Sequence, residues 1–155
     1  MGIFKEITSL FVKQMTDQIA AVVIDNGEYE CKGGFASGET PKVGYHVRTI
    51  GSKSSNSVYP IDRGIITNWS DMEDIWHKIF RFGLRVDPAE HPVLLVNNLM
   101  TPNADKERMI QIMFEKFNVP SYCATSQQLC SLYANAQTTG IVVDSGETIT
   151  HIVPV

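Results

Sequence analysis

Residues 22–28, VVIDNGE, and residues 141–147, IVVDSGE, repeat one plan within this chain. Each begins with an apolar, β-branched run that predicts a buried strand, and continues with an aspartate, a small polar residue and a glycine. Such a turn can direct backbone N–H groups at a phosphate, and an aspartate at the strand end can hold a divalent cation and its waters. A single D-x-G turn is common in hairpins. Two copies after matching strands indicate a two-part phosphate and metal site.

The region around the first copy reads as a hairpin followed by a polar insert. We expect a strand over residues 18–24, a tight turn at Asp25–Gly27 and a second strand over residues 31–36. Residues 42–58 are polar and rich in glycine and serine. Such a segment buries too little apolar surface to order itself, so we predict a mobile loop.

The rest of the chain alternates helices with short strands. Ser70 and Glu73 have the spacing of a capping box, which predicts a helix that Gly83 can end. A buried strand is predicted at residues 92–96, and a last hairpin at residues 140–144 and 148–153. Two further helices are indicated by apolar faces, and we assign those faces to the core: Met109, Ile112, Met113 and Phe117 in one, and Leu129, Leu132, Tyr133 and Ala136 in the other.

The overall composition excludes several classes of protein. The 155 residues suit one domain, and a net charge of -4 offers no basic patch for nucleic acid. No apolar run reaches the roughly 20 residues that span a bilayer. Cys31, Cys123 and Cys130 are odd in number and lack a C-x-x-C pair. We therefore expect reduced, packed thiols rather than a disulfide framework or a zinc site.

Residues 1–17 form an amphipathic extension before the domain, which we place at residues 18–155. Glu6 breaks both the myristoylation pattern and the apolar core of a secretory signal. The apolar residues fall at helical spacing: Ile3, Phe4, Ile7, Leu10, Phe11 and Met15. This face can pack on its own domain, dock a partner through residues 2–16, or remain partly ordered.

Several segments, in order and with few gaps, resemble actin. They are residues 59–69 (YPIDRGIITNW), 71–77, 84–86, 90–95, 111–115, 131–134, 138–142 and 144–146. The likeness extends over residues 19–155. It implies the α/β fold that actin shares with 70-kilodalton chaperones and hexokinase, in which two lobes clamp MgATP. This chain is similar to the first lobe, with a shortened second subdomain at residues 42–58.

The resemblance also implies roles for individual residues. Asp25 and Asp144 resemble the two aspartates that organise Mg²⁺ through water, and Lys32 resembles the lysine that contacts phosphate. Gln127 resembles the glutamine that positions the attacking water, and His151 the histidine that assists proton movement. The hairpin residues expected beside the nucleotide are Asn26, Gly27, Ser145 and Gly146. From the residues alone, a strand-end aspartate can equally serve only its own turn, and the histidine can be structural.

The two hairpins depart from the family pattern. Glu28 and Tyr29 stand where actins have a small hydroxyl residue and a second glycine, and Thr148 replaces a further glycine. Two unit charges of one sign 4 Å apart repel by about 4 kcal/mol at an effective dielectric constant near 20, so Glu28 opposes a polyphosphate. Tyr29 and Thr148 remove the backbone freedom of glycine. We expect a degraded nucleotide site.

The expected function follows from these departures and from the length of the chain. The chain stops at the second hairpin, so we expect the second lobe to be missing or supplied by another chain, and MgATP or MgADP to bind weakly or not at all. We predict a structural subunit of a cytoskeletal or other assembly, located in the cytoplasm, that is not an enzyme and binds protein subunits through residues 2–16 and the exposed interlobe face. The alternatives are a MgATP/ADP-binding protein completed by a second lobe, and a nuclear chromatin-remodelling subunit.

Overall fold

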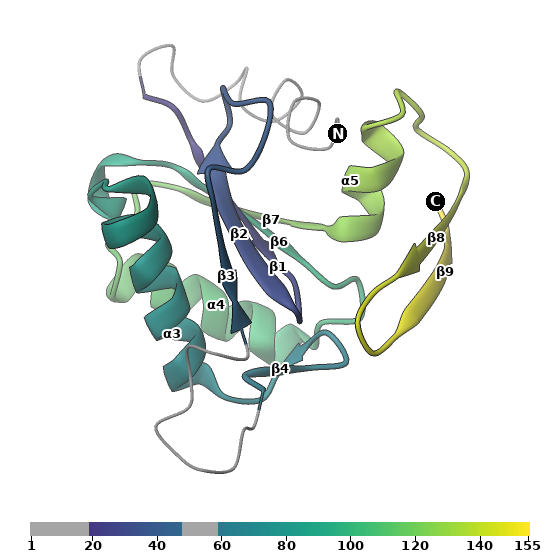
Figure 1. Cartoon of the computed structure of the whole chain (residues 1–155), viewed down its shortest axis with the longest axis horizontal. Helices are drawn as coiled ribbons and strands as arrows, with labels where there is room; N and C mark the ends of the chain where they lie inside the picture. Colours follow the sequence, from purple (N-terminus) through teal and green to yellow (C-terminus); the bar gives the residue numbers. More distant parts are fainter. Residues whose placement is uncertain (1–18, 48–58) are drawn as a thin grey trace.

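The computed structural model describes residues 19–47 and 59–155. A five-stranded sheet has the order β3-β2-β1-β6-β7. Its strands are β1 (Val22–Asn26), β2 (Glu30–Phe35), β3 (Val43–His46), β6 (Val93–Asn97) and β7 (Tyr122–Ser126). β1, β2 and β3 are antiparallel neighbours, whereas β1, β6 and β7 run parallel. The α/β fold class is therefore confirmed, and Figure 1 shows the mixed sheet at the centre of the molecule.

Alternate residues of the central strands supply two cores. Val22 and Ile24 of β1 join the larger core, which contains residues of α3 (Trp69–Lys78) and α4 (Asn103–Glu115). Val23 points to the opposite face and packs in a smaller core with Cys130 of α5 (Gln127–Tyr133). Successive side chains of a strand alternate between faces, so the sheet separates α3 and α4 from α5.

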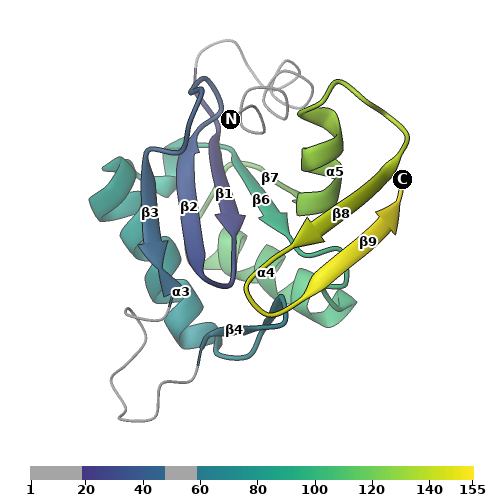
Figure 2. The ribbon, with the colours of Figure 1, turned by 45° about the vertical axis from the view of Figure 1, so that its right-hand side comes forward.

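Two small hairpins complete the described structure. β4 (Ile61–Asp62) and β5 (Ile65–Ile66) are joined by Arg63 and Gly64, which both have positive φ, as a type I′ turn requires. β8 (Ile141–Ser145) and β9 (Thr150–Pro154) form the predicted last hairpin. In Figures 1 and 2 this hairpin stands beside α5, apart from the five-stranded sheet. No helix in the described ranges is long and apolar enough to cross a membrane.

The predicted capping box at α3 is wrong. Asn68 is the N-cap residue, and its Oδ1 accepts the backbone N–H of Asp71 at 3.2 Å. Its Nδ2 donates to the Asp71 carboxylate at 2.8 Å, so the two side chains satisfy each other. Ser70 already lies inside the helix, and the Glu73 carboxylate pairs with Lys116 of the neighbouring segment.

Gly83 does not end α3, contrary to the prediction. A π-helical turn, η2 (Ile79–Leu84), continues the helix through it, and Arg85 terminates the turn in the left-handed conformation with φ 58°. A Cβ at Gly83 would lie 2.8 Å from a methyl carbon of Val43. The glycine is therefore required for the close approach of η2 to β3. A short 3-10 turn, η3 (Pro88–Glu90), then leads into β6.

The loop predicted over residues 42–58 is wrong at its start. Val43–His46 is the edge strand β3, with Val43 and Tyr45 half-buried against the larger core and Gly44 and His46 exposed. This alternation is the pattern of a strand with one covered face. Residues 48–58 and the amphipathic extension at residues 1–17 lie outside the described residues, and so does any prediction made for them.

Candidate functional site

The two repeated motifs form two hairpins with matching register. In the first hairpin Asp25 of β1 pairs with Lys32 of β2, and in the second Asp144 of β8 pairs with His151 of β9. Each aspartate is thus the cross-strand neighbour of a basic residue seven positions later. The likeness that the sequence showed in the turns therefore extends to the strands that carry them.

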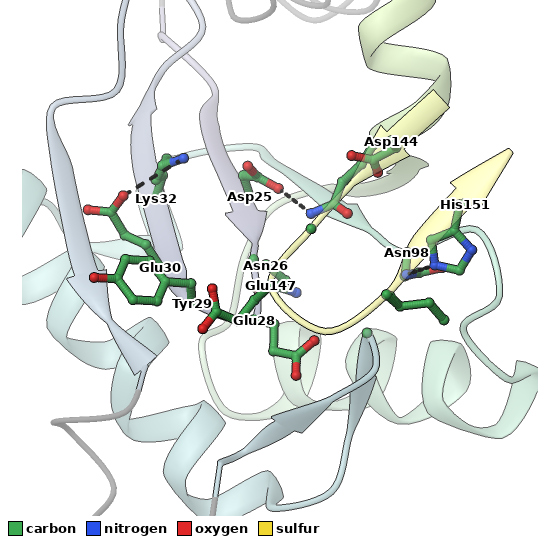
Figure 3. A pocket seen from close by; sticks show the side chains of 15 residues that line it. Asp25, Asn26, Glu28, Tyr29, Glu30, Lys32, Asn98, Asp144, Glu147 and His151 are labelled. Atoms are coloured by element: carbon green, nitrogen blue, oxygen red, sulfur yellow. Dashed lines mark hydrogen bonds and ion pairs between the residues drawn. The ribbon is translucent and has the colours of Figure 1, made fainter. Parts of the chain in front are cut away.

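A pocket of about 270 Å³ lies between the hairpins. The wall is completed by Gln127 at the start of α5, by Gly64 of the β4–β5 turn and by Asn98, which follows β6. Of the nine residues expected in the site, the pocket is lined by Asp25, Asn26, Gly27, Lys32, Gln127, Asp144, Gly146 and His151. Figure 3 shows residues from both hairpins converging on it. Ser145 is not part of the lining, and its hydroxyl hydrogen-bonds Thr150 at 3.0 Å.

Two consecutive glutamines at the start of α5 hold the two aspartates. Gln127 Nε2 donates to Asp25 Oδ1 at 2.8 Å, and Gln128 Nε2 donates to Asp144 Oδ2 at 2.7 Å. Ser126 caps α5 by accepting a hydrogen bond from the backbone N–H of Leu129. The cap fixes the first turn of the helix, and with it the positions of Gln127 and Gln128. Gln128 is fully buried, and its Oε1 has no hydrogen-bond partner among the described residues. α5 therefore connects the two hairpins through adjacent side chains.

Asp25 lies in a less polar environment than an ordinary carboxylate. Burial raises its pKa, and the nearby charge of Asp144 acts in the same direction. The hydrogen bond from Gln127 and the charge of Lys32 oppose that shift. The Lys32 amine itself lies 3.8 Å from the Glu30 carboxylate, so it is shared between acids rather than reserved for one.

The side chain of Asn26 serves the core. Its Oδ1 accepts the indole N–H of Trp76 at 3.0 Å, and its Nδ2 donates to Asn97 at 2.7 Å. The thiol of Cys31 also lies within 3.5 Å of Oδ1. Because its side chain is engaged in these contacts, Asn26 has only its backbone groups to offer a ligand in the pocket. Gly27 is required by the turn itself, because a Cβ there would lie 2.4 Å from the carbonyl oxygen of Glu30.

His151 is held in one tautomer. Asn98 Oδ1 accepts the backbone N–H of Met100 at 2.9 Å, so the amide presents its Nδ2 to His151 Nε2, 2.8 Å away. An NH₂ group only donates, so Nε2 accepts and the ring proton resides on Nδ1. A Cβ at Gly64 would collide with this same Asn98 side chain, at 2.3 Å from Nδ2. The β4–β5 turn thus supports the asparagine that orients the histidine.

Residues of the site that were missed from the sequence include Gln128, Asn98 and Gly64. Asn98 follows the buried run at residues 93–97, much as Asp25 ends its own strand, and this position was the available signal. Gln128 gave no signal beyond its place next to Gln127. Gly64 was present only as one residue of the actin-like segment at residues 59–69.

The comparisons with known proteins agree with one another. A profile of the actin family, described as Actin, matches residues 16–155. The chain belongs to the actin family. It is 38% identical over 168 aligned positions to a protein of Neurospora crassa named "Actin-like protein". That alignment covers 91% of this chain and 44% of the relative, so the chain spans less than half the length of the curated relative that it matches. The α/β structure is that of a partial first lobe of the actin fold.

The lining of the pocket carries more acidic than basic side chains. Its lining contains five carboxylates and one lysine: Asp25, Glu28, Glu30, Asp144 and Glu147, with Lys32. No cluster of three or more histidine, cysteine or acidic side chains within the described ranges could ligate a metal directly. Asp25 and Asp144 are the carboxylates that could hold Mg²⁺ through its waters, and the ion would there supply charge neutralisation for a phosphate. Glu28 and Glu147, at the hairpin tips, oppose that phosphate.

Proposed function

We propose that this actin-family chain serves as a structural and interaction subunit of a larger protein assembly and does not hydrolyse ATP. The observation that carries the proposal is the apolar outer face of the β8–β9 hairpin. Ile141, Val143 and Ile152 are 73%, 65% and 69% exposed, and Val143 is the cross-strand neighbour of Ile152. An apolar row of this kind is suited to burial against another polypeptide.

The occupant of this face is, in our proposal, the polypeptide of an actin-like second lobe. It is either the continuation of a longer chain or a separate subunit. The face is a strand surface in which apolar residues alternate with the inward-facing Val142 and Asp144. A further strand or helix with apolar side chains would complete it. We place the assembly in the cytoplasm, in the cytoskeleton, by analogy with the family.

The experiment compares Val143→Lys with Gln137→Lys in the cells of origin. Gln137 is an exposed residue just before the hairpin. The Gln137→Lys substitution therefore adds the same positive charge outside the apolar row. Native mass spectrometry of affinity-purified protein should show loss of bound subunits in Val143→Lys and full retention in Gln137→Lys. If both variants retain their subunits, the hairpin face is not the interface. Steady-state ATP hydrolysis by the purified wild type above the buffer rate would contradict the rest of the proposal.

A second candidate function is binding of MgATP or MgADP in a cleft completed by a second lobe. The convergence of Asp25, Lys32, Gln127, Asp144 and His151 on one pocket favours it. Isothermal titration of MgADP into the assembled protein should then give an affinity that Asp144→Ala lowers by at least about tenfold. Equal titrations of wild type and Asp144→Ala would count against it.

A further inference from the structure

The tips of the two site hairpins are joined directly by a hydrogen bond. The hydroxyl of Thr148, at the tip of β8–β9, donates to Oε2 of Glu28, at the tip of β1–β2, at 2.6 Å. The two residues are 120 positions apart in the chain. Within the described ranges, no other hydrogen bond or ion pair runs from one of these hairpins straight to the other.

Glu28 and Thr148 are two of the residues in which the hairpins depart from the actin pattern. Each departure taken alone damages a phosphate site, because Glu28 adds negative charge and Thr148 replaces a glycine. The structure shows that the two changes are partners. The hydroxyl that Thr148 adds is the donor, and the carboxylate that Glu28 adds is the acceptor.

We infer that the Glu28–Thr148 hydrogen bond is a built-in latch that holds the two hairpin tips together without a ligand. An ionised carboxylate accepts hydrogen bonds and donates none, as a phosphate oxygen does. Glu28 can therefore occupy the position of an anion between the tips. An incoming polyphosphate would have to displace Glu28 from Thr148 while facing its charge. With the latch, the two hairpin tips stay together in the absence of any bound ligand.

The rest of the site is consistent with a closed arrangement that requires no ligand. Asp25 and Asp144 are both bound to adjacent glutamines on α5, and His151 is bound to Asn98. These contacts hold each hairpin at the residue pair next to the last one before its turn. The latch holds the tips, which lack any other direct link between them in the described structure. The hairpin tips and the strand residues beside them are thus fixed by separate contacts.

The test is amide hydrogen exchange on the purified full chain, compared among wild type, Thr148→Val, Glu28→Ala and Thr150→Val. Thr148→Val keeps the shape of the side chain but removes the donor. It should speed exchange at residues 26–31, in the other hairpin, by roughly threefold to tenfold, the range expected for one solvent-exposed hydrogen bond. Glu28→Ala should have the reciprocal effect at residues 145–150.

Thr150→Val is the matched control. It removes a hydroxyl from the same hairpin, but that hydroxyl pairs with Ser145 of the same hairpin at 3.0 Å. It should leave exchange at residues 26–31 unchanged. The latch is refuted if Thr148→Val and Thr150→Val affect residues 26–31 equally, or if each variant affects only its own hairpin. Glu28→Gln, whose amide oxygen can still accept from Thr148, should retain most of the protection.

Discussion

The indole N–H of Trp76 donates a hydrogen bond to the side-chain oxygen of Asn26, 3.0 Å away, beneath the candidate site. Both residues are buried, and they join α3 to the end of β1 across 50 positions of sequence. A residue that the motif associates with a nucleotide therefore also stabilises the domain. Substitutions in the motif will change folding as well as binding, and the two effects have to be measured separately.

Asn26→Ala should reduce the free energy of unfolding by about 2–4 kcal/mol, because it leaves the Trp76 N–H and the Asn97 oxygen buried without a partner. Urea denaturation followed by circular dichroism measures this. The double variant Asn26→Ala/Trp76→Phe should lose less stability than the sum of the losses in the two single variants, because both substitutions break the same hydrogen bond. Strict additivity would show that the bond contributes nothing.

Asp25 should give the protein a specific pH dependence. Burial raises its pKa above the ordinary value of 3.8, so the folded state binds this proton more tightly than the unfolded state does. Stability is therefore lost as pH rises from 3.8 through the raised pKa. Asp25→Asn, which keeps an oxygen for Gln127, should raise the melting temperature at pH 7 and lose that advantage towards pH 3.8.

The control for Asp25→Asn is Asp62→Asn, which makes the same change in net charge at an exposed position of β4. Thermal denaturation of both variants between pH 3.5 and pH 7 separates the effect of the site from the effect of total charge. A pH-independent difference between wild type and Asp25→Asn would contradict the assignment.

The three cysteines should differ in reactivity. Cys31 and Cys130 are buried thiols, and Cys123 is half-buried. Burial raises the pKa of Cys130 to about 12 and that of Cys31 well above its ordinary value. A pKa of about 12 leaves about one thiol in ten thousand ionised at pH 8, and the thiolate is the reactive form. Iodoacetamide should therefore alkylate Cys123 first in the native protein, as peptide mass spectrometry can show. All three should react once concentrated urea has unfolded the protein.

Gly83 should be required for packing rather than for ending a helix. Gly83→Ala places a methyl group against the side chain of Val43, which is stiff because it branches at Cβ. We expect a net loss of about 1–2 kcal/mol, because overpacking outweighs the better helix propensity of alanine. Val43→Ala should rescue part of that loss, so the double variant should be more stable than the sum of single costs predicts. An increase in stability in Gly83→Ala alone would refute the close approach.

The elements with strong local signals were predicted correctly. Val22–Ile24, Val93–Val96 and the last hairpin carry β-branched runs with turns beside them, and each forms a strand within a few residues of its expected bounds. The family and the convergence of Asp25 and Asp144 also followed from the sequence, since two matching motifs define matching hairpins.

The elements that were missed depend on tertiary neighbours. β7 has the sequence YCATS, with little apolar character, and owes its extended form to parallel pairing with β6. β3 was hidden in a polar segment because only Val43 and Tyr45 face the core. The Gln128–Asp144 bond joins residues from a helix and a distant hairpin, and no local pattern encodes such a contact.

The parallel pairing of β1 with β6 has a consequence for biosynthesis. Asn26 and Asn97, which hydrogen-bond at the ends of these strands, are separated by 71 positions. At about 5–20 residues per second, a ribosome needs roughly 4–14 seconds to cover that interval. Nascent chains that end before residue 93 should therefore expose one edge of β1 and remain sensitive to protease. The emergence of β6 ends this exposure, so the central strand of the nascent domain depends on timely translation or on a chaperone to avoid aggregation.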